Sequence, residues 1–134
     1  MAVELRILAW SCVLLLIHIF AAAHLKTKQY GTKWNMGARD EVLPEPLPIV
    51  GRLARAQANF FETFPIVAAA ILIVTLAGLT SRWTEIGAIV WLAARILYLP
   101  VYAAGIKRVR TLIFLVSVVG IGMVLWPALF HGLR

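Results

Sequence analysis

Long segments without charged residues dominate this sequence. Three of them carry no charge at all, over residues 7–25, 63–81 and 111–130, and a fourth, over residues 86–106, is interrupted only by Arg95. Each is about as long as a helix must be to cross the hydrocarbon core of a bilayer. We therefore expect an all-α integral membrane protein, a single four-helix bundle over residues 1–134 with spans at about residues 5–26, 56–80, 84–106 and 110–130.

The composition excludes several classes of protein. Hydrophobic residues make up 62% of the chain and charged residues 14%, which is too apolar for a soluble globular domain or a disordered chain. The single cysteine, Cys12, excludes an intrachain disulfide and a paired-cysteine metal site. The net charge of +7 does not indicate a nucleic-acid partner, because the basic residues fall between apolar segments rather than among aromatic residues on a polar surface.

Basic residues are distributed unequally between the two ends of such a bundle. With four spans, both termini share one side, and the connections that follow spans one and three share the other. The connection side carries Lys26, Lys28, Lys33, Arg39, Arg52, Arg55, Lys107, Arg108 and Arg110, whereas the opposite side carries Arg6, Arg82 and Arg134. Because cytoplasmic loops are rich in lysine and arginine, we expect the long first linker, at about residues 27–51, to be cytoplasmic and both termini to be outside.

Prolines and glycines indicate how the spans are connected and packed. Pro44, Pro46 and Pro48 alternate in the first linker, a pattern that disfavours helix and predicts a stiff, extended strap. The connection between spans two and three has no proline, and residues 78–82 are expected to make the chain reversal. The short loops predict antiparallel neighbours, with close helix approach permitted at Gly120 and Gly122.

Polar side chains form two stripes at helical spacing. The helix that carries the second span begins before the membrane, and its stripe consists of Arg52, Arg55, Asn59 and Glu62. The stripe on the third span consists of Arg95, Tyr98 and Tyr102. At about 100° per residue, each stripe occupies one face of its helix. An arginine near the bilayer centre costs about 3 kcal/mol on insertion scales, so Arg95 requires an anionic partner rather than lipid.

Two interpretations of these stripes are open. In the first, Glu62 is the partner of Arg95, and a buried ion pair fixes the register of the two helices. In the second, the missing anion is a ligand, because the three arginines of the stripes outnumber their single carboxylate. A small peptide with two carboxylates, an ammonium and a thiol suits the second interpretation, with guanidinium groups for the carboxylates, Glu62 for the ammonium and Asn59 for a backbone amide.

The stripes also carry a family resemblance. Arg55-Ala56-Gln57 followed by Asn59, Glu62, Phe64 and Pro65, and then Arg95-x-x-Tyr98-x-x-x-Tyr102-x-x-Gly105, resemble the membrane-associated proteins in eicosanoid and glutathione metabolism, the MAPEG family. Residues 37–41 resemble bacterial members, which favours a bacterial inner membrane. The resemblance implies a homotrimer of four-helix protomers that binds glutathione as a co-substrate between neighbouring protomers, at the cytoplasmic side, and needs no metal.

The resemblance implies roles for particular residues. Arg55, Asn59, Glu62, Arg95, Tyr98 and Tyr102 match glutathione-contacting positions of the family, and Arg52 joins them only because it lies in the same stripe. Family enzymes stabilise the thiolate with an arginine near the start of the fourth span, for which Arg108 and Arg110 are both candidates. We favour Arg110 because it adjoins the apolar segment, and we expect Tyr102 to donate a hydrogen bond to the sulfur or to position the electrophile.

Three classes of function are consistent with the sequence. The leading hypothesis is a microsomal-type glutathione transferase, or a glutathione peroxidase, that acts on lipophilic electrophiles supplied by the membrane. The alternative is a non-catalytic scaffold of the same fold that binds membrane lipids. A small transporter or channel ranks last, because the ionisable residues concentrate towards one end instead of lining a path across the bilayer.

Overall fold

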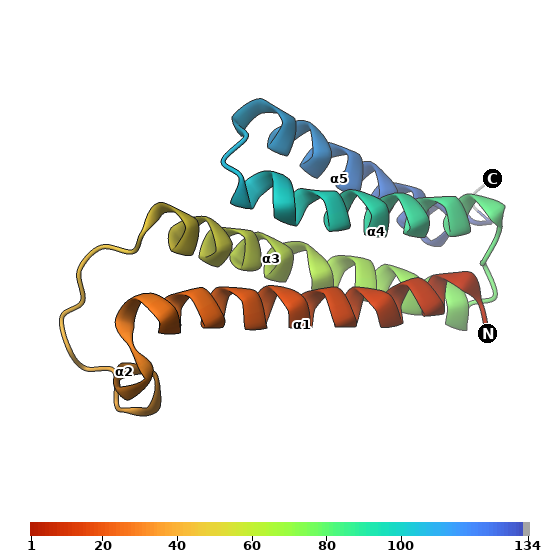
Figure 1. Cartoon of the computed structure of the whole chain (residues 1–134). Coiled ribbons are helices and arrows are strands. Elements are labelled where there is room, and N and C mark those ends of the chain that lie inside the picture. Colours follow the sequence, from red (N-terminus) through yellow and green to blue (C-terminus); the bar gives the residue numbers. More distant parts are fainter. Residues whose placement is uncertain (133–134) are drawn as a thin grey trace.

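Four long helices and one short helix make up the part of the protein that the structure describes. The computed structural model describes residues 1–132, so Arg134, counted above, lies outside the described residues. The helices are α1 (Val3–Tyr30), α2 (Thr32–Met36), α3 (Pro48–Leu76), α4 (Arg82–Ala103) and α5 (Lys107–Phe130), as Figure 1 shows. All except α2 are long and apolar enough to cross a membrane, which confirms the expected all-α architecture with four candidate spans.

The helix boundaries differ from the prediction around the first linker. The second span was expected near residue 56, on a helix that begins before the membrane and follows a linker ending at about residue 51; α3 begins at Pro48. A proline is tolerated at the first position of a helix because its missing N–H would have no intrahelical partner there. Pro48 therefore starts a helix instead of continuing the strap, and the linker contains the short helix α2, which the sequence analysis did not predict.

The strap itself is extended and is tied to the end of α1. The hydroxyl of Tyr30 donates a hydrogen bond of 2.7 Å to the carbonyl oxygen of Pro44. Gln29 donates its side-chain amide to the carbonyl oxygen of Glu45 at 3.1 Å and accepts from the backbone N–H of Leu47 at 2.8 Å. These bonds hold the proline-rich segment against α1, and the backbone of Leu47, with φ −55° and ψ 150°, is extended.

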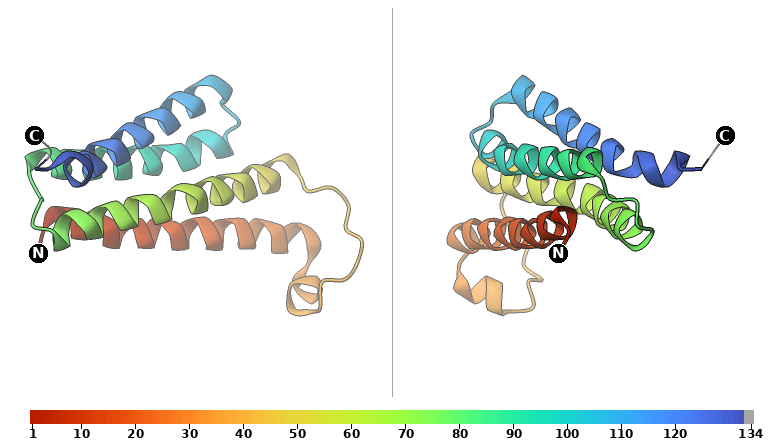
Figure 2. Two further views of the ribbon diagram at one scale, coloured as in Figure 1. Left: turned by 180° about the vertical axis from the view of Figure 1, so that it is seen from behind. Right: turned by 90° about the vertical axis from the view of Figure 1, so that its right-hand side faces the viewer.

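The four long helices pack as two pairs, with α3 and α4 in the middle of the bundle. Helix α1 packs on α3 and α5 on α4, while α3 and α4 contact each other between them (Figure 2). The first linker and the α4–α5 turn lie at one end of the bundle, and the N-terminus lies at the other end with the α3–α4 turn (Figure 1). This arrangement confirms the predicted topology and places most basic residues at the end that carries the linker.

The predicted reversal between α3 and α4 is present. Gly78 adopts a φ of 68°, which glycine reaches without steric cost. Ser81 caps α4 in a capping box with Thr84. The hydroxyl of Thr84 also donates to the carboxylate of Glu4, at 2.5 Å, and so joins the start of α4 to the start of α1.

Two glycines bring the backbones of α4 and α5 into contact. A Cβ atom added at Gly120 would lie 2.7 Å from both the carbonyl oxygen of Gly87 and the backbone nitrogen of Trp91. The expected close approach at Gly120 is therefore confirmed, whereas at Gly122 it is wrong, because a Cβ there would meet nothing within 4 Å. From this crossing the two helices diverge toward the turn that connects them (Figure 1).

Candidate functional site

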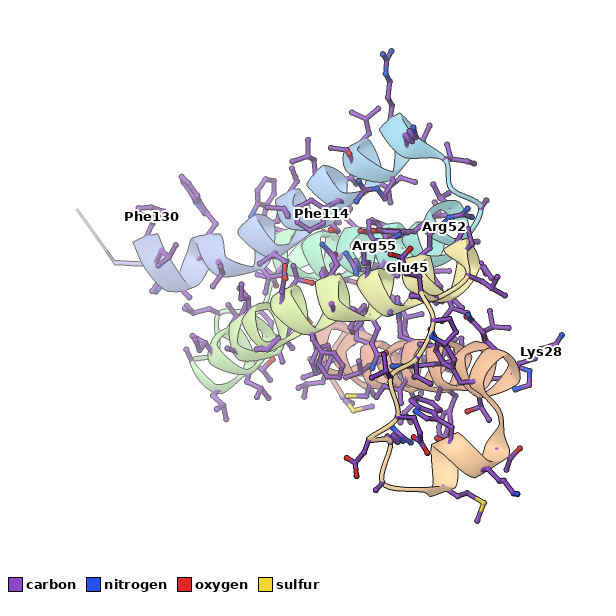
Figure 3. The ribbon with its side chains drawn as sticks, turned by 90° about the vertical axis from the view of Figure 1, so that its left-hand side faces the viewer. Lys28, Glu45, Arg52, Arg55, Phe114 and Phe130 are labelled. Carbon is purple, nitrogen blue, oxygen red and sulfur yellow. The ribbon has the colours of Figure 1, made fainter. Side chains whose placement is uncertain are left out.

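A cationic pocket opens at the linker end, where α3, α4 and α5 meet. Its volume is about 400 Å³. Figure 3 shows Arg52 and Arg55 near the linker end of α3, in the region of α4. The lining residues carry four cationic side chains and no carboxylate; they are Arg52, Arg55, Tyr102, Gly105, Ile106, Lys107 and Arg110. Such a pocket attracts anions.

Arg52 is fixed at the end of α4. Its Nη1 donates a hydrogen bond of 2.8 Å to the carbonyl oxygen of Ala103, the last residue of that helix. Cations are favoured at this end because the final carbonyl groups of a helix have no intrahelical partner. Gly105 makes the approach possible, since its φ is 75° and a Cβ added to it would lie 3.1 Å from the guanidinium carbon of Arg52.

Tyr102 is held between two arginines. The Nε of Arg55 donates a hydrogen bond of 3.1 Å to the phenolic oxygen of Tyr102. The guanidinium carbon of Arg110 lies 4.7 Å from the centre of the same ring, a cation–π distance. Because the oxygen of Tyr102 accepts from Arg55, its own hydroxyl hydrogen is free to be donated to a ligand.

The arginines of the pocket have no carboxylate partner within the described chain. Across residues 1–132, the ion pair that the structure contains is Arg82–Glu85, at the other end of the bundle. The two candidate thiolate-stabilising residues also differ in position. Arg110 is half-buried and lines the pocket, whereas Arg108 is exposed and does not line it.

Arg95 and Tyr98 lie outside the pocket, in the interior of the bundle. Arg95 is fully buried, and its Nη1 donates a hydrogen bond of 2.6 Å to the side-chain oxygen of Asn59. Its guanidinium carbon lies 4.2 Å from the ring centre of Tyr98 and 5.2 Å from that of Phe60. Both predicted stripes exist, but the members of the second have different surroundings. Arg95 and Tyr98 belong to a buried cluster, whereas Tyr102 lines the pocket.

Glu62 does not pair with Arg95 in this structure. It lies exposed on α3, one turn from Asn59. The ion-pair interpretation of the stripes is therefore wrong for the single chain, because Asn59 accepts the Arg95 guanidinium instead. Since the oxygen of Asn59 is engaged by Arg95, its amide N–H groups are left as donors.

Two features were missed by sequence reasoning. Lys107 lines the pocket. Its position in the basic cluster before the last span was the sequence feature that could have identified it as a site residue. His18 of α1 is buried, with its ring centre 4.9 Å from that of Phe60, so it adjoins the Arg95 cluster. A histidine within an apolar helix gives no sequence signal for that neighbourhood, because the contact depends on how α1 packs on α3.

An apolar groove lies beside the cationic pocket. It has a volume of about 340 Å³ and is lined, between α4 and α5, by Val90, Ala93, Ala94, Leu97, Leu112, Ile113 and Val116. Ile113 follows Arg110 by three residues, so the two lie on one face of α5. The apolar groove therefore begins within about one turn of the cationic pocket along α5 and extends toward the middle of α4.

Comparison with known proteins gives one match. The model of the MAPEG family matches residues 7–130, which is nearly the whole chain. No curated protein and no solved structure matches it.

Proposed function

Since the chain belongs to the MAPEG family, we propose that it is a glutathione-dependent membrane transferase or peroxidase that acts on lipophilic electrophiles. The observation that carries the proposal is the cationic pocket, in which three arginines and a lysine line one cavity with no carboxylate. Glutathione brings two carboxylates, and its thiol becomes a third anionic group when it is deprotonated. Its charges thus complement those of the pocket.

The carboxylates of glutathione are assigned to the α3 side of the pocket. Arg52 and Arg55 are both anchored by a hydrogen bond that leaves further guanidinium N–H groups free. Guanidinium groups bind carboxylates through paired hydrogen bonds, and the pocket volume of about 400 Å³ lies in the range of small-molecule sites. Lys107 adds a charge on the opposite wall.

Asn59 and Glu62 lie along α3 beyond the pocket. Glu62 is exposed and Asn59 is half-buried. We assign Glu62 to the ammonium of glutathione and the amide N–H groups of Asn59 to one of its carbonyl oxygens, with the ligand extending along α3. A neighbouring protomer of a homotrimer would cover this face, as in the family. Arg95 is a positioning residue in this scheme, because it acts through Asn59, and Tyr98 contributes a ring against it.

Arg110 is assigned to the sulfur. A thiol with a pKa near 8.5 is largely protonated at neutral pH, and lowering that pKa by about two units requires about 2.7 kcal/mol of preferential thiolate stabilisation. Arg110 has no hydrogen-bond partner within the described chain and stacks on Tyr102. The guanidinium N–H groups of Arg110 and the hydroxyl of Tyr102 can therefore both donate hydrogen bonds to the thiolate.

The chemistry then follows from the thiolate. In conjugation, the sulfur attacks an electrophilic carbon, a C–S bond forms, and the electron pair of the broken bond leaves with the leaving group or opened ring oxygen, which takes up a proton. In hydroperoxide reduction, the O–O bond breaks, and two glutathione molecules give the disulfide, an alcohol and water. The electrophile approaches from the bilayer through the apolar groove between α4 and α5.

The alternative is a non-catalytic lipid-binding scaffold, which the same apolar groove favours. The two functions differ in whether a thiolate is needed. Our proposal further places the linker end in the cytoplasm of a bacterium, in its inner membrane, since the basic residues gather at that end. Glutathione would then reach the pocket from the cytoplasm.

A glutathione titration tests the proposal. Purified protein in detergent is titrated while heat release and the ultraviolet absorbance of the thiolate are recorded, for the wild type and for Arg110→Ala. The matched control is Arg108→Ala, which removes the same charge two residues away from an exposed position. We expect saturable binding in all three proteins and loss of the thiolate signal in Arg110→Ala alone.

The other outcomes are equally informative. A thiolate that survives in Arg110→Ala but is lost in Arg108→Ala would transfer the role to Arg108. Absence of glutathione binding up to millimolar concentrations would reject the enzyme and favour the scaffold.

A further inference from the structure

A second cavity lies on the other side of α3, facing α1 and α2. Its volume is about 230 Å³, and none of its lining residues belongs to the cationic pocket. Ile19 and Ala22 of α1 line one part, and Lys26 lies one to two turns closer to the end of the helix. Helix α1 thus gives the cavity an apolar inner part and a cationic mouth.

Trp34 of α2 forms the polar wall. Its side chain is 8% exposed, and its indole N–H is buried without a hydrogen-bond acceptor in the part of the chain that the structure describes. Two cations lie over the ring, with Lys26 Nζ at 5.3 Å and the guanidinium carbon of Arg39 at 4.9 Å from its centre. An indole N–H in this position needs an acceptor that the protein does not supply.

Arg39 is held in place by the backbone and by Asn35. It has a φ of 61°, a left-handed conformation that non-glycine residues seldom adopt. Its Nε and Nη2 donate to the carbonyl oxygen of Asn35 at 3.2 and 3.0 Å. The guanidinium is therefore fixed beside Trp34 at the mouth of the cavity, although its side chain is exposed.

These groups together suit an anion with several oxygen atoms. Within residues 1–132, neither Lys26 nor Arg39 forms an ion pair with a carboxylate. An anion bound here would be attracted to both cations. A phosphate group can accept from Lys26, Arg39 and the Trp34 N–H at once, because each of its oxygens is a strong acceptor.

The phosphate could belong to a membrane lipid or be free in solution. The apolar part of the cavity and its place at the end of the bundle favour the lipid. We propose that this cavity binds the phosphate headgroup of an anionic membrane lipid. A volume of about 230 Å³ holds a headgroup but not the acyl chains. The chains then lie outside, on the exposed apolar face of α1 that includes Leu16, Ile17 and Phe20. Basic pockets between membrane helices at the cytoplasmic side suit such headgroups.

Lipid titration of the full chain tests this site independently of glutathione. Purified protein in neutral detergent is titrated with phosphatidylglycerol, with phosphatidylcholine and with inorganic phosphate, and native mass spectrometry gives the number bound and the apparent Kd. We expect saturable binding of phosphatidylglycerol, one per chain. Each cation near an anionic lipid contributes about fivefold to affinity, so Lys26→Gln/Arg39→Gln is expected to weaken binding about 25-fold.

The control variant carries the same change of charge. Lys28→Gln/Lys33→Gln removes two exposed lysines at the same end of the bundle that do not line this cavity, and Figure 3 shows Lys28 pointing away from the helices. Its affinity is expected to stay within about twofold of the wild type, because neither lysine lines the cavity. Trp34→Phe keeps an aromatic six-membered ring at this position but removes the pyrrole part of the indole with its N–H, and is expected to weaken binding about tenfold.

Three results would overturn the inference. Equal losses in the two double variants would show diffuse attraction rather than a site. Equal affinity for phosphatidylcholine and phosphatidylglycerol would remove the requirement for net negative charge. Inorganic phosphate binding as tightly as the lipid would assign the cavity to free phosphate. If Lys26→Gln/Arg39→Gln does not fold, an unchanged affinity in Trp34→Phe still rejects the proposed contact.

Discussion

Replacing Gly120 with alanine tests how the crossing of α4 and α5 sets the geometry of the cationic pocket. The added Cβ would lie 2.7 Å from the carbonyl oxygen of Gly87 and 2.7 Å from the backbone nitrogen of Trp91, whereas ordinary contacts begin at 3.4 Å. Both obstructing atoms belong to the backbone, so no side chain can rotate away. Helix α5 must therefore move outward by about 0.7 Å.

This displacement has an energetic and a functional consequence. Forcing a methyl group into a close-packed contact costs about 1–3 kcal/mol, and the better helix propensity of alanine offsets up to about 1 kcal/mol. Together these terms leave a net loss of up to about 3 kcal/mol in the free energy of unfolding, and a loss of about 1–3 kcal/mol relative to a glycine-to-alanine change in the same helix that gains helix propensity without the contact. Because α5 carries Arg110 and α4 carries Tyr102, the shift also separates the groups assigned to the thiolate. A misplacement near 1 Å can cost about a hundredfold in activity.

The assay compares Gly120→Ala with Gly122→Ala in the same helix. Gly122 has open space where its Cβ would be, so alanine there is expected to leave stability unchanged or raise it by up to about 1 kcal/mol. Thermal unfolding in detergent measures stability, and the thiolate absorbance at saturating glutathione measures the pocket. Equal stability of the two variants would refute the backbone contact. A destabilised Gly120→Ala with a full thiolate signal would refute its link to the pocket.

Two more substitutions follow from the contacts of the site. Tyr102→Phe keeps the ring beneath Arg110 but removes the hydroxyl. We expect the pKa of the bound glutathione thiol to rise by about one unit, measured by a pH titration of the thiolate absorbance. An unchanged pKa would exclude a hydrogen bond from Tyr102 to the sulfur. Asn59→Leu removes the acceptor of the buried Arg95 guanidinium, and is expected to cost about 1.5–3 kcal/mol of stability in thermal unfolding. Asn59→Leu/Arg95→Leu should recover part of that loss, and a double variant less stable than the single one would contradict the assignment.

Much of the architecture could be predicted because it depends on local composition. The uncharged segments predicted four spans since a bilayer requires a fixed helix length, and the glycine-containing connection predicted the reversal after α3. Boundaries around the linker were less accurate. Proline has a fixed φ and no backbone N–H, and both properties suit an extended strap as well as the first position of a helix. The sequence alone therefore did not show that α3 begins at Pro48. Helix α2 is five residues long, too short to produce a periodic pattern.

The candidate site divides in the same way. Periodicity placed the polar residues on one face of each helix, but it contains no information about which neighbour that face meets. The packing of α4 against α3 buries Arg95 beside Asn59 and leaves Glu62 exposed. The position of the α4–α5 turn brings Arg110 to Tyr102 and leaves Arg108 outside the pocket.

The sequence by itself determined that this protein has four apolar helices, that most of its basic residues lie at one end of them, and that two helices carry polar stripes. These properties follow from side-chain chemistry and from the 3.6-residue period of the helix. Only the tertiary structure decided that the cationic pocket and the cavity beside Trp34 lie at that end on opposite sides of α3. The physical reason is that a cavity is bounded by side chains from several helices, and their distances are set by packing contacts such as Gly87 on Gly120.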